Sequence, residues 1–182
     1  MIIGITGERQ TGKNTLANYI QYSNNLISTR RHIIEIKSFA AKLKSLCQEM
    51  FPLIKNMDYY EYNPIDKEIE IPKYKMSPRD IWIKVGQELR TINPDVFVEY
   101  LINNITNFDR HYIISDVRFQ NEIDHLKKAN AVIIKLNRNN GLKKIKSEKQ
   151  IKNFKVDIEF DNNGSVNELL ILADAIVKNY LN

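Results

Sequence analysis

Near its amino end the sequence reads Gly7-Glu-Arg-Gln-Thr-Gly12-Lys13-Asn14-Thr15, directly after the apolar run Met1-Ile-Ile-Gly-Ile-Thr6. The short apolar run predicts a strand that is buried on both faces. Leu16, Tyr19 and Ile20 have helical spacing, so a helix is predicted to begin where the loop ends. A G-x-x-x-x-G-K sequence between a strand and a helix is typical of a phosphate-binding loop. Its glycines let successive amides face inward, and the helix start carries partial positive charge.

This loop supplies the candidate nucleotide-binding residues, which are Gly7, Arg9, Gly12, Lys13, Asn14 and Thr15. We expect Lys13 to reach the β- and γ-phosphates of ATP as a point charge and to act in catalysis. Phosphate loops usually carry a magnesium-binding Ser or Thr directly after the lysine, but Asn14 stands there and the hydroxyl comes at Thr15. Adenylate-kinase-like enzymes share this offset, which favours a nucleotide kinase over a motor protein or GTPase. The alternative is a tight strand-to-helix turn that matches the motif by chance.

Composition narrows the class of protein. The 182 residues fit one domain, and 43% apolar with 27% charged residues is typical of a soluble globular chain. The formal net charge of +5 suits an anionic small-molecule substrate but is too small to indicate nucleic acid. The single cysteine, Cys47, fits a reducing compartment. With no segment that resembles a signal peptide or a membrane span, we expect a cytoplasmic protein (host cytoplasm for a viral one) without a membrane partner.

Strand and helix signals alternate along the rest of the chain. Further strands are predicted at residues 32–37, 111–115, 131–136 and 156–160. Helix starts are predicted at Ser77-Pro78, Asn93-Pro94 and Ser165, where an N-cap residue is present. This alternation predicts an α/β fold with a central parallel five-stranded sheet flanked by helices. Residues 52–76 are predicted to form a loop or a mobile insertion rather than a second domain, and residues 138–155 an exposed segment.

The third predicted strand leads into charged residues. Asp116 follows the apolar run, and ligands of such sheets bind beyond the carboxyl ends of the strands. We therefore expect a catalytic role for Asp116 and, together with Thr15, contact with magnesium through water. The alternative is that Asp116 caps the next helix. Arg118 and Glu122 are candidate contacts to substrate phosphate and sugar, or else form an ion pair with each other.

Two arginines share one face of the helix that begins at Pro78. Arg90 follows Arg79 by eleven positions, which is about three turns, and Gly86 lies on the same line. Trp82 flanks that line, so an aromatic ring and a gap between two guanidinium groups would suit a base and its phosphate. Arg79, Trp82 and Arg90 are therefore candidate substrate-binding residues. The alternative is an ordinary core tryptophan with solvated arginines.

A basic segment follows the fourth predicted strand. Arg138 comes directly after it, and the lysines that follow are Lys143, Lys144, Lys146 and Lys149. A basic flap that closes over the phosphates would exclude water and neutralise charge, so Arg138 is a candidate catalytic residue. A solvated run of charges is the commoner explanation for the lysines.

With these residues in place, the chain resembles the phage and viral deoxynucleoside monophosphate kinases, relatives of adenylate kinase. The matching pieces include residues 7–15, Ser38-Phe-Ala-x-x-Leu-Lys44, Ser77-Pro-Arg79, Ser115-Asp-Val-Arg-Phe-x-Asn-Glu122 and Asp161-Asn-Asn-Gly-Ser165. The resemblance implies a P-loop kinase fold that uses ATP with Mg²⁺ as donor and a dNMP as acceptor. It also implies that residues 1–182 form a single kinase domain, with an acceptor-binding insertion at 38–93 and a lid at 138–155.

The same resemblance implies further roles for individual side chains. Lys44 joins Arg79 and Arg90 as a plausible contact to the acceptor phosphate, and Arg138 becomes a lid residue over ATP. Three other functions stay open at this point. They are a P-loop kinase for another metabolite, similar to phosphomevalonate kinase, an ATP-binding switch or DNA-stimulated ATPase, and a non-catalytic nucleotide-binding protein. The sequence also leaves a homodimer open.

Overall fold

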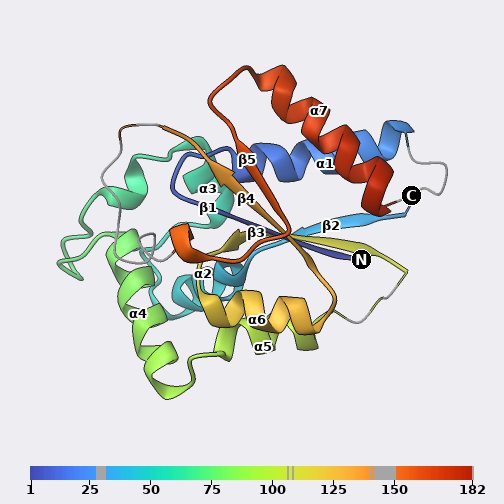
Figure 1. Ribbon diagram of the computed structural model, residues 1–182. Helices are drawn as coiled ribbons and strands as arrows, with labels where there is room; N and C mark the ends of the chain where they lie inside the picture. Colours follow the sequence, from blue (N-terminus) through green and yellow to red (C-terminus); the bar gives the residue numbers. More distant parts are fainter. Residues whose placement is uncertain (28–31, 106, 108, 140, 142–150, 182) are drawn as a thin grey trace. The chain divides into compact units, whose positions relative to one another are not determined.

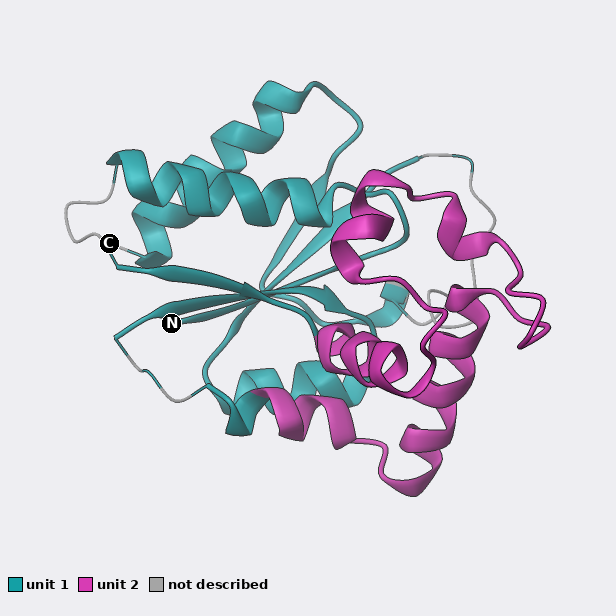
Figure 2. Ribbon diagram, turned by 180° about the vertical axis from the view of Figure 1, so that it is seen from behind, with its two compact units in different colours: residues 1–38, 102–182 teal, residues 39–101 magenta. Residues whose placement is uncertain are grey.

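The computed structural model describes the chain except for residues 28–31, 106, 108, 140, 142–150 and 182. It divides into two compact units. Unit 1 consists of residues 1–38 and 102–182, and unit 2 of residues 39–101 (Figure 2). Each unit is described separately below.

Unit 1 is built on a sheet of five strands in the order β2-β3-β1-β4-β5 (Figure 1). The strands are β1 (Ile2–Gly7), β2 (Ile34–Lys37), β3 (His111–Val117), β4 (Val132–Asn137) and β5 (Ile158–Asp161). Every neighbouring pair is parallel, so all five strands end at the same edge. This confirms the predicted α/β fold with a five-stranded parallel sheet. It also brings the ends of β1, β3 and β4 to that edge although they lie far apart in the sequence.

Helices cover both faces of this sheet (Figure 1). They are α1 (Lys13–Ile27), α6 (Gln120–Lys128) and α7 (Val166–Ile176), which continues as a π-helical turn, η4 (Val177–Leu181). α1 and α7 pack together on one face, where their buried side chains and those of the inner strands form a continuous apolar core. α6 lies on the opposite face. Ser165 begins α7 with a capping box, as predicted.

Unit 2 is helical. Its elements are α2 (Phe39–Met50), α3 (Met57–Tyr62), the 3₁₀ helix η1 (Asp66–Glu68), α4 (Pro78–Ile92) and residues 96–101 of α5 (Val96–Asn103). The predicted start of α4 is confirmed, because Ser77 and Asp80 form a capping box and Pro78 is the first helical residue. Residues 52–76, predicted as a loop or a mobile insertion, contain two short helices, α3 and η1. Asn56 caps α3 there by accepting from the Tyr59 amide at 2.9 Å.

The predicted exposed segment 138–155 is also corrected in its last part. Ile151 and Phe154 are buried, and Ile151–Asn153 forms the 3₁₀ helix η3. The physical reason is that both side chains are apolar, and removing apolar surface from water is favourable even where the surrounding residues are polar. The four lysines between 143 and 149 lie outside the described residues. In the part of the chain that the structure describes, no helix has both the length and the apolar character needed to cross a bilayer.

Candidate functional site

The phosphate loop joins β1 to α1, as predicted. Its backbone has positive φ at Gln10 (57°) and at Gly12 (95°), and Gly7 has a φ of 150°. Such alternation curls a chain so that its amides converge on one point, which is the arrangement that binds phosphate. Within the loop, Thr11 Oγ1 donates to the carbonyl of Glu8 at 3.0 Å. The loop is therefore shaped by its own hydrogen bonds as well as by its glycines.

Both glycines of the motif are required by close neighbours. A Cβ added at Gly7 would lie 2.5 Å from the carbonyl oxygen of Leu136 in β4. A Cβ added at Gly12 would lie 2.6 Å from Nδ2 of Asn162. Backbone with positive φ also disfavours residues that have a side chain. The two positions therefore accept glycine for steric and for conformational reasons.

Lys13 lies against the loop. Its Nζ donates to the carbonyl oxygens of Gly7 at 2.8 Å and Glu8 at 2.5 Å. The ammonium group is thus held at the place where the phosphates of a nucleotide would meet the loop. Asn14 and Thr15 are exposed in the first turn of α1, and Arg9 is partly buried in the loop. Thr15 can therefore offer its hydroxyl to a ligand or to a water molecule.

Asp116 is held by a neighbouring strand. Ser38 follows β2 directly, and its Oγ donates to Asp116 Oδ2 at 2.8 Å. Asp116 does not cap α6, because the N-cap residue of that helix is Phe119. The amides at the start of α6 donate instead to Glu122. This residue is buried and accepts from the amides of Arg118 at 2.7 Å and Phe119 at 3.1 Å. The alternative in which Asp116 is the capping residue is therefore excluded.

A polar cleft of about 310 Å³ lies beside the phosphate loop in unit 1. Its lining residues are Glu8, Lys135, Asn137, Arg138, Asn139, Ile151, Asp161 and Asn163. Arg138 is exposed and lies in this lining directly after β4. Because Glu8 belongs to the loop, a molecule whose phosphates rest on the loop could place its base and sugar in the cleft. Asn and Asp side chains there offer both donors and acceptors to such a molecule.

A buried lysine supports the floor of this cleft. Lys135 is only 6% exposed, and its Nζ lies 2.8 Å from Glu159 Oε1. Asn137 Nδ2 donates to the same oxygen at 2.8 Å and to Asp161 Oδ1 at 3.0 Å. These contacts, first the Asn137 hydrogen bond and then the Lys135 hydrogen bond, hold the pKa of Glu159 below its usual value. The network fixes the ends of β4 and β5 where they border the cleft.

In unit 2, four of the predicted substrate-binding residues lie on or against α4. Lys44 Nζ lies over the ring of Trp82, 5.5 Å from its centroid, and Tyr60 meets the same ring edge-on. Trp82 is buried, as in the alternative of an ordinary core residue, but its Nε1 has no hydrogen-bond partner among the described residues. An indole N–H that is buried in this way normally has an acceptor.

The two arginines of α4 have different surroundings. Arg79 Nε lies 2.9 Å from Glu68 Oε1, and Arg90 packs over the ring of Phe97 with its Cζ 4.4 Å from the centroid. The predicted gap at Gly86 is corrected. Leu43 of α2 fills that space, since a Cβ at Gly86 would lie 2.9 Å from Leu43 Cδ2. Gly86 therefore allows two helices to approach closely and leaves no room there for a base.

Among curated proteins, the chain is 30% identical over 154 residues to a protein of Acanthamoeba polyphaga mimivirus named "Putative deoxynucleotide monophosphate kinase". The match covers 76% of this chain and 74% of the viral protein. No family model matches the chain. The chain belongs to the deoxynucleotide monophosphate kinase family. Its α/β sheet with flanking helices is consistent with a P-loop kinase fold.

Two residues near the phosphate loop and the sheet edge were not predicted individually. Ser38 and Asn162 both lie in pieces that carry the family resemblance, but no local pattern assigns them a role. Ser38 contacts Asp116, and Asn162 Nδ2 donates to the carbonyl of Thr11 at 2.9 Å. The available signal was their position directly after a strand, at the edge where ligands bind.

The features of unit 1 fit the two groups that the family implies. Loop amides and Lys13 suit a phosphate chain, and the oxygen atoms of Asp116 and Thr15 are of the kind that Mg²⁺ or its water ligands prefer. The hydrogen bond from Ser38 orients the Asp116 carboxylate. The site residues named from the sequence therefore fall into two groups. Those of unit 1 lie around the phosphate loop and one edge of the sheet, and those of unit 2 are Lys44, Arg79, Trp82 and Arg90.

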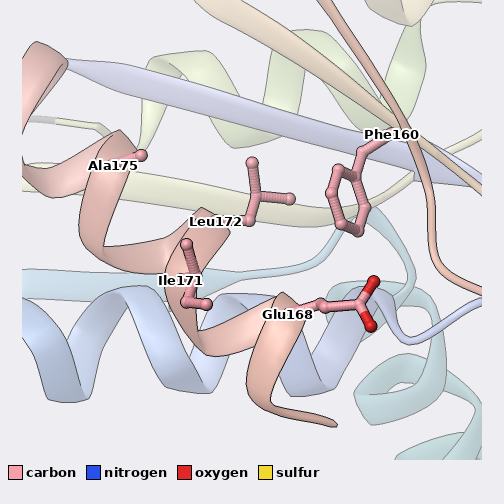
Figure 3. Close-up of a pocket in the computed structure, with 5 residues that line it drawn as sticks. All are labelled: Phe160, Glu168, Ile171, Leu172 and Ala175. Atoms are coloured by element: carbon pink, nitrogen blue, oxygen red, sulfur yellow. The ribbon is translucent and has the colours of Figure 1, made fainter. Parts of the chain in front are cut away.

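A second hollow, of about 290 Å³, is unsuited to a nucleotide. Phe160, Ile171, Leu172 and Ala175 make it mostly apolar, with the Glu168 carboxylate at one end (Figure 3). Glu168 accepts from the Ser165 amide at 3.1 Å and so serves the start of α7. An acidic group in an apolar hollow repels phosphate. The polar cleft beside the phosphate loop is therefore the better nucleotide site in unit 1.

Proposed function

We propose that this protein transfers the γ-phosphate of ATP to a deoxynucleoside 5′-monophosphate, giving a deoxynucleoside diphosphate and ADP. The observation that carries the proposal is the phosphate loop with Lys13 beside a polar cleft of about 310 Å³ that Glu8 helps to line. The name of the mimivirus relative supports the class of acceptor. Together they favour a nucleotide as donor and a nucleoside monophosphate as acceptor.

The reaction is a displacement at phosphorus. An oxygen of the acceptor phosphate forms a bond to the γ-phosphorus, and the bond from that phosphorus to the β,γ-bridging oxygen breaks. ADP leaves with the electron pair of that bond. The acceptor phosphate is already an anionic nucleophile, so no strong general base is required. Catalysis then consists of aligning two anions and offsetting their mutual repulsion.

Unit 1 is proposed to bind ATP. Lys13 would exchange its contacts with the Gly7 and Glu8 carbonyls for phosphate oxygens, and Arg138 would add charge from the cleft. Asp116 and Thr15 would hold Mg²⁺ through water, and Arg118 would contact substrate phosphate. Magnesium, when bound, neutralises negative charge on phosphate oxygens. We keep residues 138–155 as the proposed lid. The Glu122 carboxylate already accepts hydrogen bonds from two amides. Among the proposed substrate contacts, that of Glu122 therefore has the least support.

Residues of unit 2 are proposed to bind the acceptor. Lys44, Arg79 and Arg90 supply positive charge for its phosphate, and arginine can bind two phosphate oxygens at once. Nε1 of Trp82, which has no hydrogen-bond partner within the described part of the chain, is a donor that an acceptor's base or phosphate could satisfy. The proposed acceptor-binding insertion, residues 38–93, contains all four of these residues. The donor and the acceptor would thus be bound by different parts of one chain.

The test is phosphate transfer from ATP-Mg²⁺ to each common dNMP and NMP, with products separated by chromatography. We expect dNDP and ADP in equal amounts. Lys13→Ala should fold and lose transfer by a factor of about 100 to 1,000, because it removes a charge aimed at the transferring phosphate. Lys178→Ala is the matched control, since Lys178 is an exposed lysine of η4. Normal turnover by Lys13→Ala would refute the site.

Three other outcomes would replace the proposal. Transfer to phosphomevalonate but to no nucleotide would indicate a kinase for another phosphorylated metabolite. ATP hydrolysis that rises with DNA rather than with monophosphates would indicate a nucleic-acid-stimulated ATPase. ATP binding without transfer to any monophosphate would indicate a non-catalytic nucleotide-binding protein. Each outcome is read in the same assay with a different added compound.

A further inference from the structure

A hydrogen bond of Asn162 links the end of β5 to the phosphate loop. It follows β5, is only 6% exposed, and its Nδ2 donates to the backbone carbonyl of Thr11 in the phosphate loop at 2.9 Å. Thr11 itself is 1% exposed, so the bond is shielded from water. A buried amide that reaches across 151 residues to a single loop carbonyl is more than a local cap. Its partner lies between the two residues of the loop that have clearly left-handed φ values, Gln10 and Gly12.

The bond fixes the direction of one peptide unit. In a trans peptide the C=O of one residue and the N–H of the next point in opposite directions. With the Thr11 carbonyl aimed at Asn162, the Gly12 amide must point away from Asn162. Gly12 has a φ of 95°, and glycine can also adopt the flipped arrangement because it has no Cβ. Asn162 therefore selects one of two orientations of the Gly12 amide.

The same residue is tied to the wall of the polar cleft. The backbone N–H of Asn162 donates to the backbone carbonyl of Asn137 at 2.8 Å. The neighbouring Asn163 accepts through Oδ1 from the backbone N–H of Asn139 at 2.8 Å. Asn137, Asn139 and Asn163 all line the cleft. Asn162 thus stands between the cleft lining on one side and the phosphate loop on the other. Both of these Asn162 hydrogen bonds end on backbone carbonyls, one in the phosphate loop and one at the end of β4. Neither carbonyl can move unless its own segment moves.

We infer that Asn162 is a positioning residue for nucleotide binding, which holds the Gly12 amide toward the phosphates and couples the cleft lining to the phosphate loop. The ligand it serves is the phosphate chain of a nucleoside di- or triphosphate. The inference rests on the proposed function, because it assumes that ATP phosphates bind the loop. Asn162 itself need not touch the nucleotide. Its loss should weaken the binding of phosphates more than the binding of nucleoside.

The test compares Asn162→Ala with Asn24→Ala. Asn24 is a matched control, because it is also buried and its Nδ2 donates to a backbone carbonyl, that of His32, at 2.9 Å. It lies in the last part of α1, away from the phosphate loop. Thermal unfolding of both variants measures the loss of a buried hydrogen bond that is common to them. Calorimetric titration with ADP and inhibition by adenosine then separate phosphate binding from nucleoside binding.

We expect the dissociation constant for ADP and the KM for ATP to rise roughly tenfold in Asn162→Ala, as the loss of one well-aligned amide contact to a charged group predicts. The adenosine inhibition constant and the KM for the dNMP should stay within about twofold of the wild-type values. Asn24→Ala should leave all four within the same limit. If Asn162→Ala does not fold, Asn162→Ser keeps a shorter donor and is measured in the same way.

Unchanged ADP affinity in a folded Asn162 variant would overturn the inference. An equal loss for ADP and adenosine would also overturn it, because the effect would then be on the cleft alone. Failure of the proposed function is recognised separately: the wild-type protein would then bind neither ADP nor ATP, or would bind them without phosphorylating any dNMP. In the first case the Asn162 inference is overturned as well, and in the second case it is still decided by the ADP titration.

Discussion

Ser38 donates a hydrogen bond from Oγ to Oδ2 of Asp116 at 2.8 Å. The two residues are 78 positions apart, but β2 and β3 are neighbours in the sheet, so the residues that follow them meet at its edge. A hydroxyl that donates to one oxygen of a carboxylate fixes the rotation of that carboxylate. We propose that Ser38 orients Asp116 toward magnesium or the water around it.

Replacement of Ser38 tests this relationship. We expect Ser38→Ala to lower kcat about tenfold and to raise the Mg²⁺ concentration that gives half-maximal rate, because Asp116 loses its orientation. Ser38→Thr keeps the hydroxyl and should retain most activity. Ser45→Ala is the control, since Ser45 Oγ donates to Glu49 Oε1 at 3.0 Å on an exposed surface. A wild-type Mg²⁺ dependence in Ser38→Ala would show that Asp116 needs no such support.

Arg79 tests the acceptor site of unit 2. Its ion pair with Glu68 is partly exposed, with 31% and 49% of the two side chains accessible, so it contributes little to stability. Arg79→Ala should therefore leave thermal unfolding nearly unchanged and raise the KM for the dNMP by about tenfold or more, with the KM for ATP unaffected. Lys84→Ala, an exposed cation on the same helix, is the control. Equal effects on both Michaelis constants would place Arg79 outside the acceptor site.

Gly7 is predicted to be the glycine least tolerant of a side chain. A Cβ there would meet the Leu136 carbonyl at 2.5 Å and Thr11 Oγ1 at 2.7 Å. Gly7→Ala should lower the free energy of unfolding by more than about 2 kcal/mol, because a strand and the phosphate loop must both move. At Gly141 the φ is 65°, but no described residue has an atom within 4 Å of an added Cβ, so Gly141→Ala should lower the free energy of unfolding by only about 1 kcal/mol. Urea unfolding measures both, and equal losses would contradict the steric argument.

His111 should make stability depend on pH. Burial, then the nearby Met1 ammonium and His32, lower the pKa of His111 below its ordinary value of 6.5. The folded protein then binds fewer protons than the unfolded chain just below that pH. The contribution to stability is therefore fully present above pH 6.5 and is lost as the pH falls from 6.5 toward the lowered pKa.

Urea unfolding at pH 7.5 and 5.5 checks the sign. The wild-type free energy of unfolding should fall between the two values, and His111→Gln should reduce that fall. Gln48→Ala on α2 is the control and should retain the fall, because the exposed Gln48 side chain does not titrate. A fall of wild-type size in His111→Gln would assign the pH dependence to other groups.

Much of the fold could be predicted because its signals are local. The five strands are short apolar runs, and the starts of α4 and α7 carry Ser and a capping acid within four residues of each other. Where the pattern was mixed, the predictions were less good. Residues 52–76 contain prolines and charges but also the cap of α3, and the burial of Ile151 and Phe154 depends on neighbours that a single segment does not reveal.

The same division applies to the candidate site. The phosphate loop and Lys13 were predicted from nine consecutive residues between a strand and a helix, and the structure has the loop in that place. Gly86 was expected to leave a gap, but whether a glycine leaves space depends on what packs against it, which here is Leu43. The catalytic and binding roles of the individual side chains stay predictions until the variants above are measured.

By itself the sequence determined the order of the five strands, the phosphate loop and the capped starts of α4 and α7, because each depends on residues within a few turns of one another. Only the tertiary structure decided that Ser38 holds Asp116 and that Asn162 holds the Thr11 carbonyl. The physical reason is the strand order β2-β3-β1-β4-β5, which makes neighbours of segments that are remote in the chain. A hydrogen bond depends on a separation of about 3 Å in space, whatever the separation in sequence.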